Sequence, residues 1–155
     1  MSDQLTGDAA VRARVNDLPV YEFDHTPFSQ PPPLSRARVA IVTTAGLRSD
    51  GSAQWLPGDQ SFTVLDGKTR GLRIGHFSPN FDRTGFALDL NVVYPIDRLH
   101  ELAARGTIGS VASSHISFMG AQPDHTLATM RLDTGPAAAR ILCDDGVDVV
   151  LLTPV

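Results

Sequence analysis

Residues 148–155 read DVVLLTPV, an almost continuous apolar run that lies between Gly146 and the end of the chain. Valine and leucine without polar alternation are typical of a strand in a parallel sheet, where helices cover both faces. The sequence therefore predicts a buried core strand over 149–152. In α/β proteins the reacting groups lie just beyond the carboxyl ends of such strands, so we expect chemistry close to Thr153 and Pro154.

The segments before this strand supply the other expected elements of an α/β fold. Residues 38–44 read RVAIVTT and form the first-strand candidate, which Ala45-Gly46 ends. The remaining expected elements are strands at 72–76 and 90–94, a helix from a cap at Asp97 to Gly106, and a helix over 135–145 capped by Thr134 or Gly135 with Pro136 in its first turn. This order predicts a layered, Rossmann-like α/β fold with a mainly parallel sheet that is incomplete at its C-terminus.

The rest of the chain is less regular. Residues 1–35 form a proline-bearing arm whose aromatic residues Tyr21, Phe23 and Phe28 suggest that it docks on something, and residues 36–155 form the α/β domain. Residues 50–71 are rich in Gly, Ser and Asp and predict an irregular excursion anchored by Trp55 and Phe62.

Composition narrows the class of protein. With 155 residues, 42% of them hydrophobic, the chain can hold one domain with a core. The net charge of -4 and the lack of a Lys/Arg cluster argue against a nucleic-acid partner. No apolar stretch approaches the roughly 20 residues of a membrane span, and no secretory signal is visible. The single cysteine, Cys143, excludes an internal disulfide, so we expect a cytoplasmic protein.

Histidines and carboxylates occur in two clusters that could converge on a metal, namely His76, Asp82 and Asp89, and His115, Asp124 and His125. Neither cluster has a tight ligand spacing, so we expect no metal site. Two interpretations remain open for the histidines. His76 is either a site residue or a strand-end residue bonded to a neighbouring loop, and His115 is either a site residue or a cap or turn residue. A serine-hydrolase elbow is absent, and the acidic neighbours of Cys143 disfavour a reactive thiolate.

Several segments together resemble a known family. They are residues 39–46, 58–62, 91–99, 106–109, 115–120 and 145–155. In this order they resemble the selenoprotein B family of the glycine, sarcosine, betaine and D-proline reductases, and most of all the D-proline reductase type. The resemblance runs from about residue 36 to the end of the chain.

The resemblance implies a catalytic selenocysteine, or a cysteine in its place, directly after Val155. It therefore implies a truncation at a recoded UGA codon, so that this chain lacks its nucleophile and the full protein continues. It also implies reductive cleavage of a C–N bond, a pyruvoyl group on a partner subunit that activates the amine, and a dithiol that supplies electrons. We expect His76, His115, Thr153 and Pro154 to line the site, the histidines as proton donors or substrate contacts and the last two as the turn that positions the nucleophile.

Two other functions stay open at this point. In the first, the chain is a non-catalytic α/β module for small-molecule binding or assembly. In the second, it is a metal-dependent lyase or hydrolase that uses the histidines, and stoichiometric metal in the purified protein would identify it. A domain that lacks its last helices would expose apolar sheet surface, so we also expect association into an oligomer.

Overall fold

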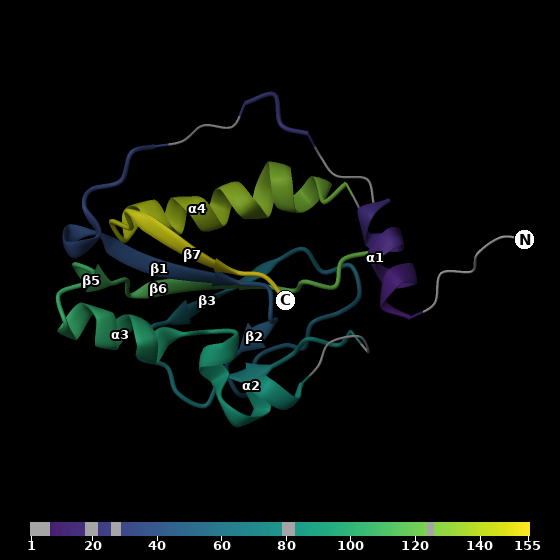
Figure 1. Ribbon diagram of the computed structural model, residues 1–155, viewed down its shortest axis with the longest axis horizontal. Helices are drawn as coiled ribbons and strands as arrows, with labels where there is room; N and C mark the ends of the chain where they lie inside the picture. The colour runs from purple at the N-terminus through teal and green to yellow at the C-terminus, as the bar shows by residue number, and fades with distance from the viewer. Residues whose placement is uncertain (1–6, 18–21, 26–28, 79–82, 124–125) are drawn as a thin grey trace, which may run out of the picture.

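The computed structural model describes residues 7–17, 22–25, 29–78, 83–123 and 126–155, which form one α/β body with a helix apart from it (Figure 1). The helices are α1 (Asp8–Asn16), α2 (Thr84–Leu88), α3 (Ile96–Ala104) and α4 (Gly135–Asp144), with the 3-10 turns η1 (Leu34–Arg36) and η2 (Leu90–Val92) and the π-helical turn η3 (Met130–Thr134). The strands are β1 (Arg38–Thr43), β2 (Leu47–Arg48), β3 (Phe62–Asp66), β4 (Arg73–Ile74), β5 (Ser110–Val111), β6 (Ser114–Phe118) and β7 (Val149–Thr153).

Strand β1 is the centre of a mainly parallel sheet. On one side it pairs with β5 and then β6, and on the other with β7, from Val39↔Val149 to Thr43↔Thr153, all in parallel. Strand β3 pairs antiparallel with β6 on the outer side. Strands β2 and β4 form a separate two-stranded antiparallel sheet. The α/β fold with a mostly parallel sheet is therefore confirmed.

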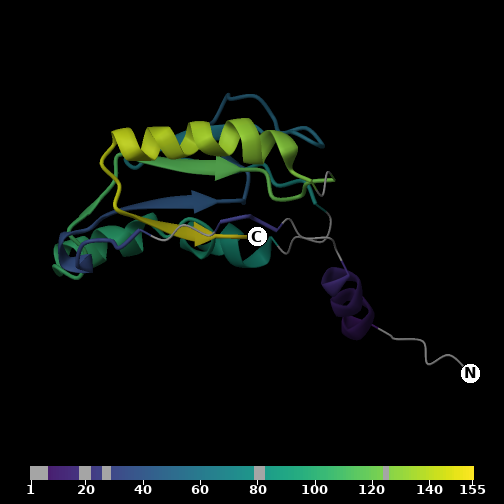
Figure 2. The ribbon, with the colours of Figure 1, turned by 90° about the horizontal axis from the view of Figure 1, so that it is seen from above.

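Helices α3 and α4 lie on opposite faces of the sheet (Figure 2). The two faces of β1 explain this, because successive side chains point to opposite sides of a strand. Val39 and Ile41 belong to the cluster that contains Leu99 of α3, while Ala40 belongs to the cluster that contains Leu142 of α4. Each helix buries one apolar stripe, and the centre of the sheet at β1 is covered on both sides.

The expected last strand forms, but its expected burial is wrong. Strand β7 has no second neighbouring strand among the described residues, and Val150 and Leu151 are each 39% exposed while Leu152 is 68% exposed. The apolar run indicated a strand that is apolar on both faces, yet it carries no information on how many neighbours that strand has. The expectation of exposed apolar sheet surface is confirmed.

The expected strand at 90–94 is wrong, since residues 90–92 form the 3-10 turn η2. The Asp89 carboxylate accepts hydrogen bonds from the backbone N–H and the side-chain amide of Asn91, both at 2.9 Å. These local bonds favour a capped turn over a strand. Helix α3 follows as expected and ends before Gly106, but it begins at Ile96, with Asp97 inside its first turn and Pro95 at the cap.

The expected last helix forms as α4, which begins at Gly135 with Thr134 at the N-cap position and Pro136 in its first turn. Thr134 makes no side-chain cap hydrogen bond, because the π-helical turn η3 leads directly into the helix. Pro136 has no N–H and its ring crowds the preceding turn, and a π-helical turn relieves this conflict. At Gly135 a side chain would overlap the carbonyl oxygen of Met130. The glycine therefore allows the turn, where the sequence suggested a cap.

Four strands were not expected, namely the two-residue strands β2 and β5 and the longer strands β3 and β6. Strand β3 lies within the predicted excursion at 50–71, and β6 contains His115, which therefore is not a cap or turn residue. Both strands mix polar and apolar residues, and β6 buries the polar Ser117 and His115 completely. A strand prediction that relies on the spacing of apolar residues misses a strand whose buried positions are polar.

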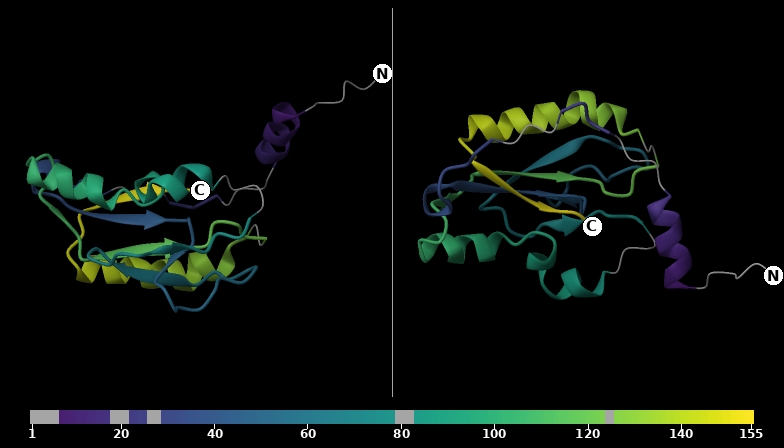
Figure 3. Two further views of the ribbon diagram at one scale, coloured as in Figure 1. Left: turned by 90° about the horizontal axis from the view of Figure 1, so that it is seen from below. Right: turned by 45° about the horizontal axis from the view of Figure 1, so that its top comes forward.

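Helix α1 lies in the N-terminal arm and stands apart from the sheet in all views (Figure 3). Phe23 is exposed, whereas Tyr21 and Phe28 lie outside the described residues. The division into an arm at 1–35 and a domain at 36–155 stays a prediction. Among the described residues, no helix has the length and apolar character that crossing a bilayer requires.

Candidate functional site at the carboxyl edge of the sheet

Strands β1, β6 and β7 run in the same direction, so their carboxyl ends meet at one edge of the sheet (Figure 1). This edge is where α/β proteins bind ligands, because chain crossings leave a crevice there. Thr43 and Thr44 follow β1 into the edge, and Thr153 and Pro154 end β7 beside them. The sequence-predicted positions 153 and 154 therefore reach the expected edge.

Threonine hydroxyls hold the end of β7 in place. The Thr44 hydroxyl accepts the backbone N–H of Val155 at 2.8 Å and donates to the Val155 carbonyl oxygen at 3.1 Å. The Thr153 hydroxyl donates to the carbonyl oxygen of Val93 at 2.9 Å, which ties the strand to the end of η2. Because these bonds fix both the backbone and the direction of residues 153–155, the strand end is a defined platform.

Gly46 connects this platform to a pocket. Its φ of +61° favours glycine, and a side chain there would come within 2.8 Å of the Met119 methyl group. The Gly46 N–H donates to the carbonyl oxygen of Phe118 at the end of β6. The Gly46 carbonyl oxygen accepts the Trp55 indole N–H at 2.8 Å and the Gly75 N–H at 2.9 Å. The turn at Gly46 therefore positions Trp55 and Gly75, which both line the pocket described next.

The pocket has a volume of about 350 Å³. Its lining comprises two arginines, one histidine and three aromatic rings, with Gln54, Ile74 and Gly75 between them: Arg48, Arg83, His76, Trp55, Phe77 and Phe86. The described lining thus carries two positive charges and no carboxylate. Such a pocket favours an anionic ligand with an apolar part.

His76 is a wall of this pocket and is only 5% exposed. Burial is the main cause that lowers the pKa of its imidazole, and the positive charge of Arg83 lowers the pKa further. The Arg83 guanidinium donates to the His76 carbonyl oxygen at 2.9 Å, so the two residues are fixed to each other. A neutral imidazole in this position can exchange a proton with a bound ligand.

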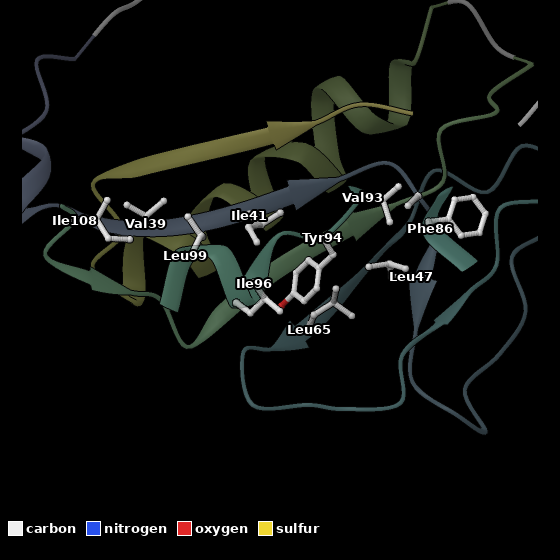
Figure 4. Packing of buried hydrophobic residues seen from close by; sticks show 11 residues of the cluster. Val39, Ile41, Leu47, Leu65, Phe86, Val93, Tyr94, Ile96, Leu99 and Ile108 are labelled. Carbon is white, nitrogen blue, oxygen red and sulfur yellow. The ribbon is translucent and has the colours of Figure 1, made fainter. Parts of the chain in front are cut away.

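His115 lies elsewhere, in the interior of the sheet, with 0% of its surface exposed. Its Nδ1 accepts the backbone N–H of Ile41 at 2.9 Å, in the gap where β1 has left β5 and not yet met β6. The ring stands edge-on to Tyr94, whose place in the core Figure 4 shows, at 5.5 Å between centroids. Burial lowers the pKa of His115 to about 4, so the ring is neutral near pH 7. The structure does not bring His115 into the pocket.

The two arginines are the residues that sequence reasoning missed. They lie 35 positions apart, Arg48 on β2 and Arg83 directly before α2, and no motif connects them. Only the turn at Gly46, which returns β2 to the sheet edge, places Arg48 beside His76. The described residues contain no group of three metal-ligating side chains, while Asp82, Asp124 and His125 lie outside them.

Comparison with known proteins finds two curated relatives. D-proline reductase subunit gamma of Acetoanaerobium sticklandii is 36% identical over 118 residues, which cover 74% of this chain and 47% of that protein. Sarcosine reductase complex component B subunit beta of Peptoclostridium acidaminophilum is 28% identical over 148 residues, which cover 88% of this chain and 32% of that protein. The chain therefore spans less than half the length of these relatives, and both relatives are named as reductase subunits. No family model and no solved structure matches the chain.

Proposed function

We propose that this chain is part of a selenol- or thiol-dependent reductase subunit that cleaves a C–N bond in an amino acid or related amine, as in the selenoprotein B family. Similarity to D-proline reductase subunit gamma over 74% of the chain supports the class of reaction. The single observation that carries the proposal is the position of Thr153 and Pro154, which end β7 at the carboxyl edge of the sheet beside the end of β1, although neither residue lines the His76 pocket. D-proline is the first substrate to test.

The nucleophile in this proposal is a selenocysteine or cysteine directly after Val155. The two bonds between Thr44 and Val155 support this placement, because they give whatever follows Val155 a fixed starting point at the site. Cys143, the single cysteine of these 155 residues, is exposed on α4, which packs on one face of the sheet and not at its carboxyl edge. The chain thus contributes the platform, and the nucleophile belongs to the sequence beyond it.

The reaction adds two electrons and two protons to the C–N bond, giving a C–H and an N–H bond, while a dithiol is oxidised to a disulfide. A pyruvoyl group on a partner subunit would activate the substrate amine. Within this chain, His76 would contact the substrate and accept a proton at an imidazole nitrogen, because its lowered pKa keeps the ring neutral. Thr153 and Pro154 would position the nucleophile. His115 would not touch the substrate and would contribute only by holding β1 in place through its bond to the Ile41 N–H.

Partner subunits and location are part of the same proposal. Both relatives carry subunit designations in their names, which supports a complex with partner subunits. The resemblance to the reductase family implies that one of these partners bears the pyruvoyl group. The free state of Cys143 is compatible with a reducing, cytoplasmic compartment.

Two measurements test the proposal. The first determines whether the native gene continues past codon 155 with UGA or a cysteine codon in an open frame, which is the expected result. The second assays the full-length protein with its partner subunits for dithiol-dependent opening of the D-proline ring. We expect turnover that is abolished when alanine replaces the residue after Val155. Tandem stop codons after Val155 would overturn the catalytic proposal and favour the alternative, a non-catalytic α/β binding or assembly module.

A further inference from the structure

Among the described residues, the lining of the His76 pocket carries two arginines and no carboxylate. Asp50, on the loop that follows β2, is engaged by the Arg73 guanidinium at 2.8 and 3.1 Å, and neither residue lines the pocket. The bond to Arg73 is the main cause that lowers the pKa of the Asp50 carboxyl, and Arg48 lies near enough for its charge to lower this pKa further. Arg48 is partly buried and Arg83 is exposed, and a bound anion would offset the positive charge of both.

Arg48 has donor capacity that the protein does not use. One terminal nitrogen donates to the Ser52 carbonyl oxygen at 2.9 Å, whereas its Nε is buried and makes no hydrogen bond within the described part of the chain. A buried donor without an acceptor is unfavourable, so most such groups in proteins are satisfied by a partner or a ligand. A guanidinium presents several N–H donors in one plane, which matches a planar anion that accepts two hydrogen bonds.

Arg83 is oriented by the protein. Its Nη2 donates to the His76 carbonyl oxygen at 2.9 Å, which fixes the guanidinium at the pocket wall and leaves other N–H groups for a ligand. The guanidinium and the imidazole therefore border the same space from neighbouring positions.

The aromatic residues of the pocket lining indicate the chemistry of the uncharged part of the ligand. The Trp55 indole N–H is already bound to the Gly46 carbonyl oxygen, so the indole offers its ring and not its donor. Phe77 and Phe86 add further apolar surface, and Phe86 is buried. An anion without carbon, such as phosphate, would leave these rings facing water, whereas a small organic carboxylate would cover them.

We propose that Arg48 and Arg83 form a carboxylate-binding subsite, which holds the carboxylate of the substrate while its carbon skeleton lies against Trp55, Phe77 and Phe86. The inference rests on the proposed function, because it assigns the substrate class of the same site. His76 then borders the bound molecule as an imidazole that can donate an N–H hydrogen bond or accept a proton. The arginines are binding residues in this assignment and take no part in bond cleavage.

The test is calorimetric titration of the full-length protein without dithiol, so that binding is measured apart from turnover. The probes are D-proline, pyrrolidine (the same ring without the carboxylate), propionate and inorganic phosphate. We expect D-proline and propionate to bind more tightly than pyrrolidine and phosphate. Arg48→Gln and Arg83→Gln should each weaken carboxylate binding about tenfold or more, which is typical for loss of hydrogen bonds to a charged group. Arg48→Lys should weaken it less than Arg48→Gln, and this keeps the test valid if the glutamine variant folds poorly.

Arg140→Gln is the matched control, since this exposed arginine on α4 lies outside the pocket lining and its loss changes the net charge equally. Equal affinity for pyrrolidine and D-proline, or unchanged affinity in both pocket variants, would overturn the carboxylate assignment. Phosphate binding as tight as propionate would overturn it in favour of a general anion site. If propionate binds in an arginine-dependent manner and D-proline is never cleaved, the subsite stands and the proposed reaction fails.

Discussion

At the residue scale, the imidazole of His115 supplies the hydrogen-bond acceptor that a neighbouring strand would otherwise provide to β1. On this side, strand β1 pairs with β5 at residues 38–39 and with β6 at residues 42–43, and Ile41 lies between the two pairings. Nδ1 of His115 accepts the Ile41 N–H there at 2.9 Å. Because Nδ1 must keep its lone pair, the ring carries its proton on Nε2. The site role that the sequence suggested for His115 stays a prediction, and its geometry favours positioning of the sheet.

The first prediction at this scale concerns His115→Phe. It removes the acceptor and leaves the Ile41 N–H buried and unpaired, so the free energy of unfolding should fall by about 2 kcal/mol. Urea titration measures this, with the exposed His100→Phe as control. Affinity for carboxylates in the folded variant should stay unchanged, and a loss of binding at unchanged stability would instead make His115 a residue of the site.

At the element scale, the long helix before β7 depends on one irregular turn. A π-helical segment at Met130–Thr134 precedes the regular helix α4, and Pro136 lies directly after the junction. Gln60, on the loop before β3, accepts the Met130 N–H at 2.9 Å through its side chain and the Thr134 hydroxyl at 2.7 Å through its backbone. The π-helical turn is therefore stabilised by hydrogen bonds to Gln60, a residue outside the helix.

Gly135→Ala tests this arrangement. In a regular helix this change is stabilising by roughly 0.5–1 kcal/mol. Here the new methyl group would overlap the Met130 carbonyl oxygen, so we expect the free energy of unfolding to fall by about 1–3 kcal/mol. Denaturant midpoints measure the sign, and the exposed Ala139→Gly in the same helix calibrates the ordinary propensity. A stabilised Gly135→Ala protein would contradict the π-helical turn.

At the scale of the whole molecule, buried neutral histidines at the sheet and pocket make the fold sensitive to acid. Burial lowers the pKa of His115 to about 4, and nearby Arg38 and His100 lower it slightly, while the Ala112 carbonyl and Asp145 oppose the shift. His76 is shifted in the same direction, chiefly by burial. The unfolded chain binds these protons near the ordinary histidine pKa of about 6.5, and the native state does not.

The free energy of unfolding should therefore fall as the pH drops from about 6.5 to 4, with His115 accounting for about 3 kcal/mol. Thermal unfolding at a series of pH values measures this slope, and His115→Phe should flatten it while the contribution of His76 remains. A wild-type stability that is constant between pH 6.5 and 4 would contradict the neutral, buried state of both histidines.

A second acid-dependent loss follows at lower pH. Burial acts to raise the pKa of the Asp145 carboxyl, but its bond to Arg38 and those from the N–H groups of Ser114 and Ser113 outweigh burial and lower the pKa. Because the native pKa is depressed, this contribution is complete above about 4 and is lost as the pH falls through the native value. His115→Phe should leave this part of the profile in place.

The sequence by itself determined the α/β class, the strands at 38–43 and 149–153, the helix that Gly106 ends and the approach of Thr153 and Pro154 to the carboxyl edge. These features depend on local patterns, since apolar runs and glycine turns express the preferences of neighbouring residues. His76 could likewise be selected from its place after a short strand. The resemblance to the reductases also came from the sequence, and the curated relatives support it.

Only the tertiary structure decided the rest. Which distant segments become neighbours decides the exposed edge of β7, the burial of His115 and the presence of Arg48 and Arg83 in the lining of one pocket. The turn at Met130–Thr134 likewise follows from contacts with Gln60, 70 positions away for Met130. A pattern along one segment records which faces are apolar, but hydrogen bonds and charges between segments are fixed only when the sheet and its two layers assemble.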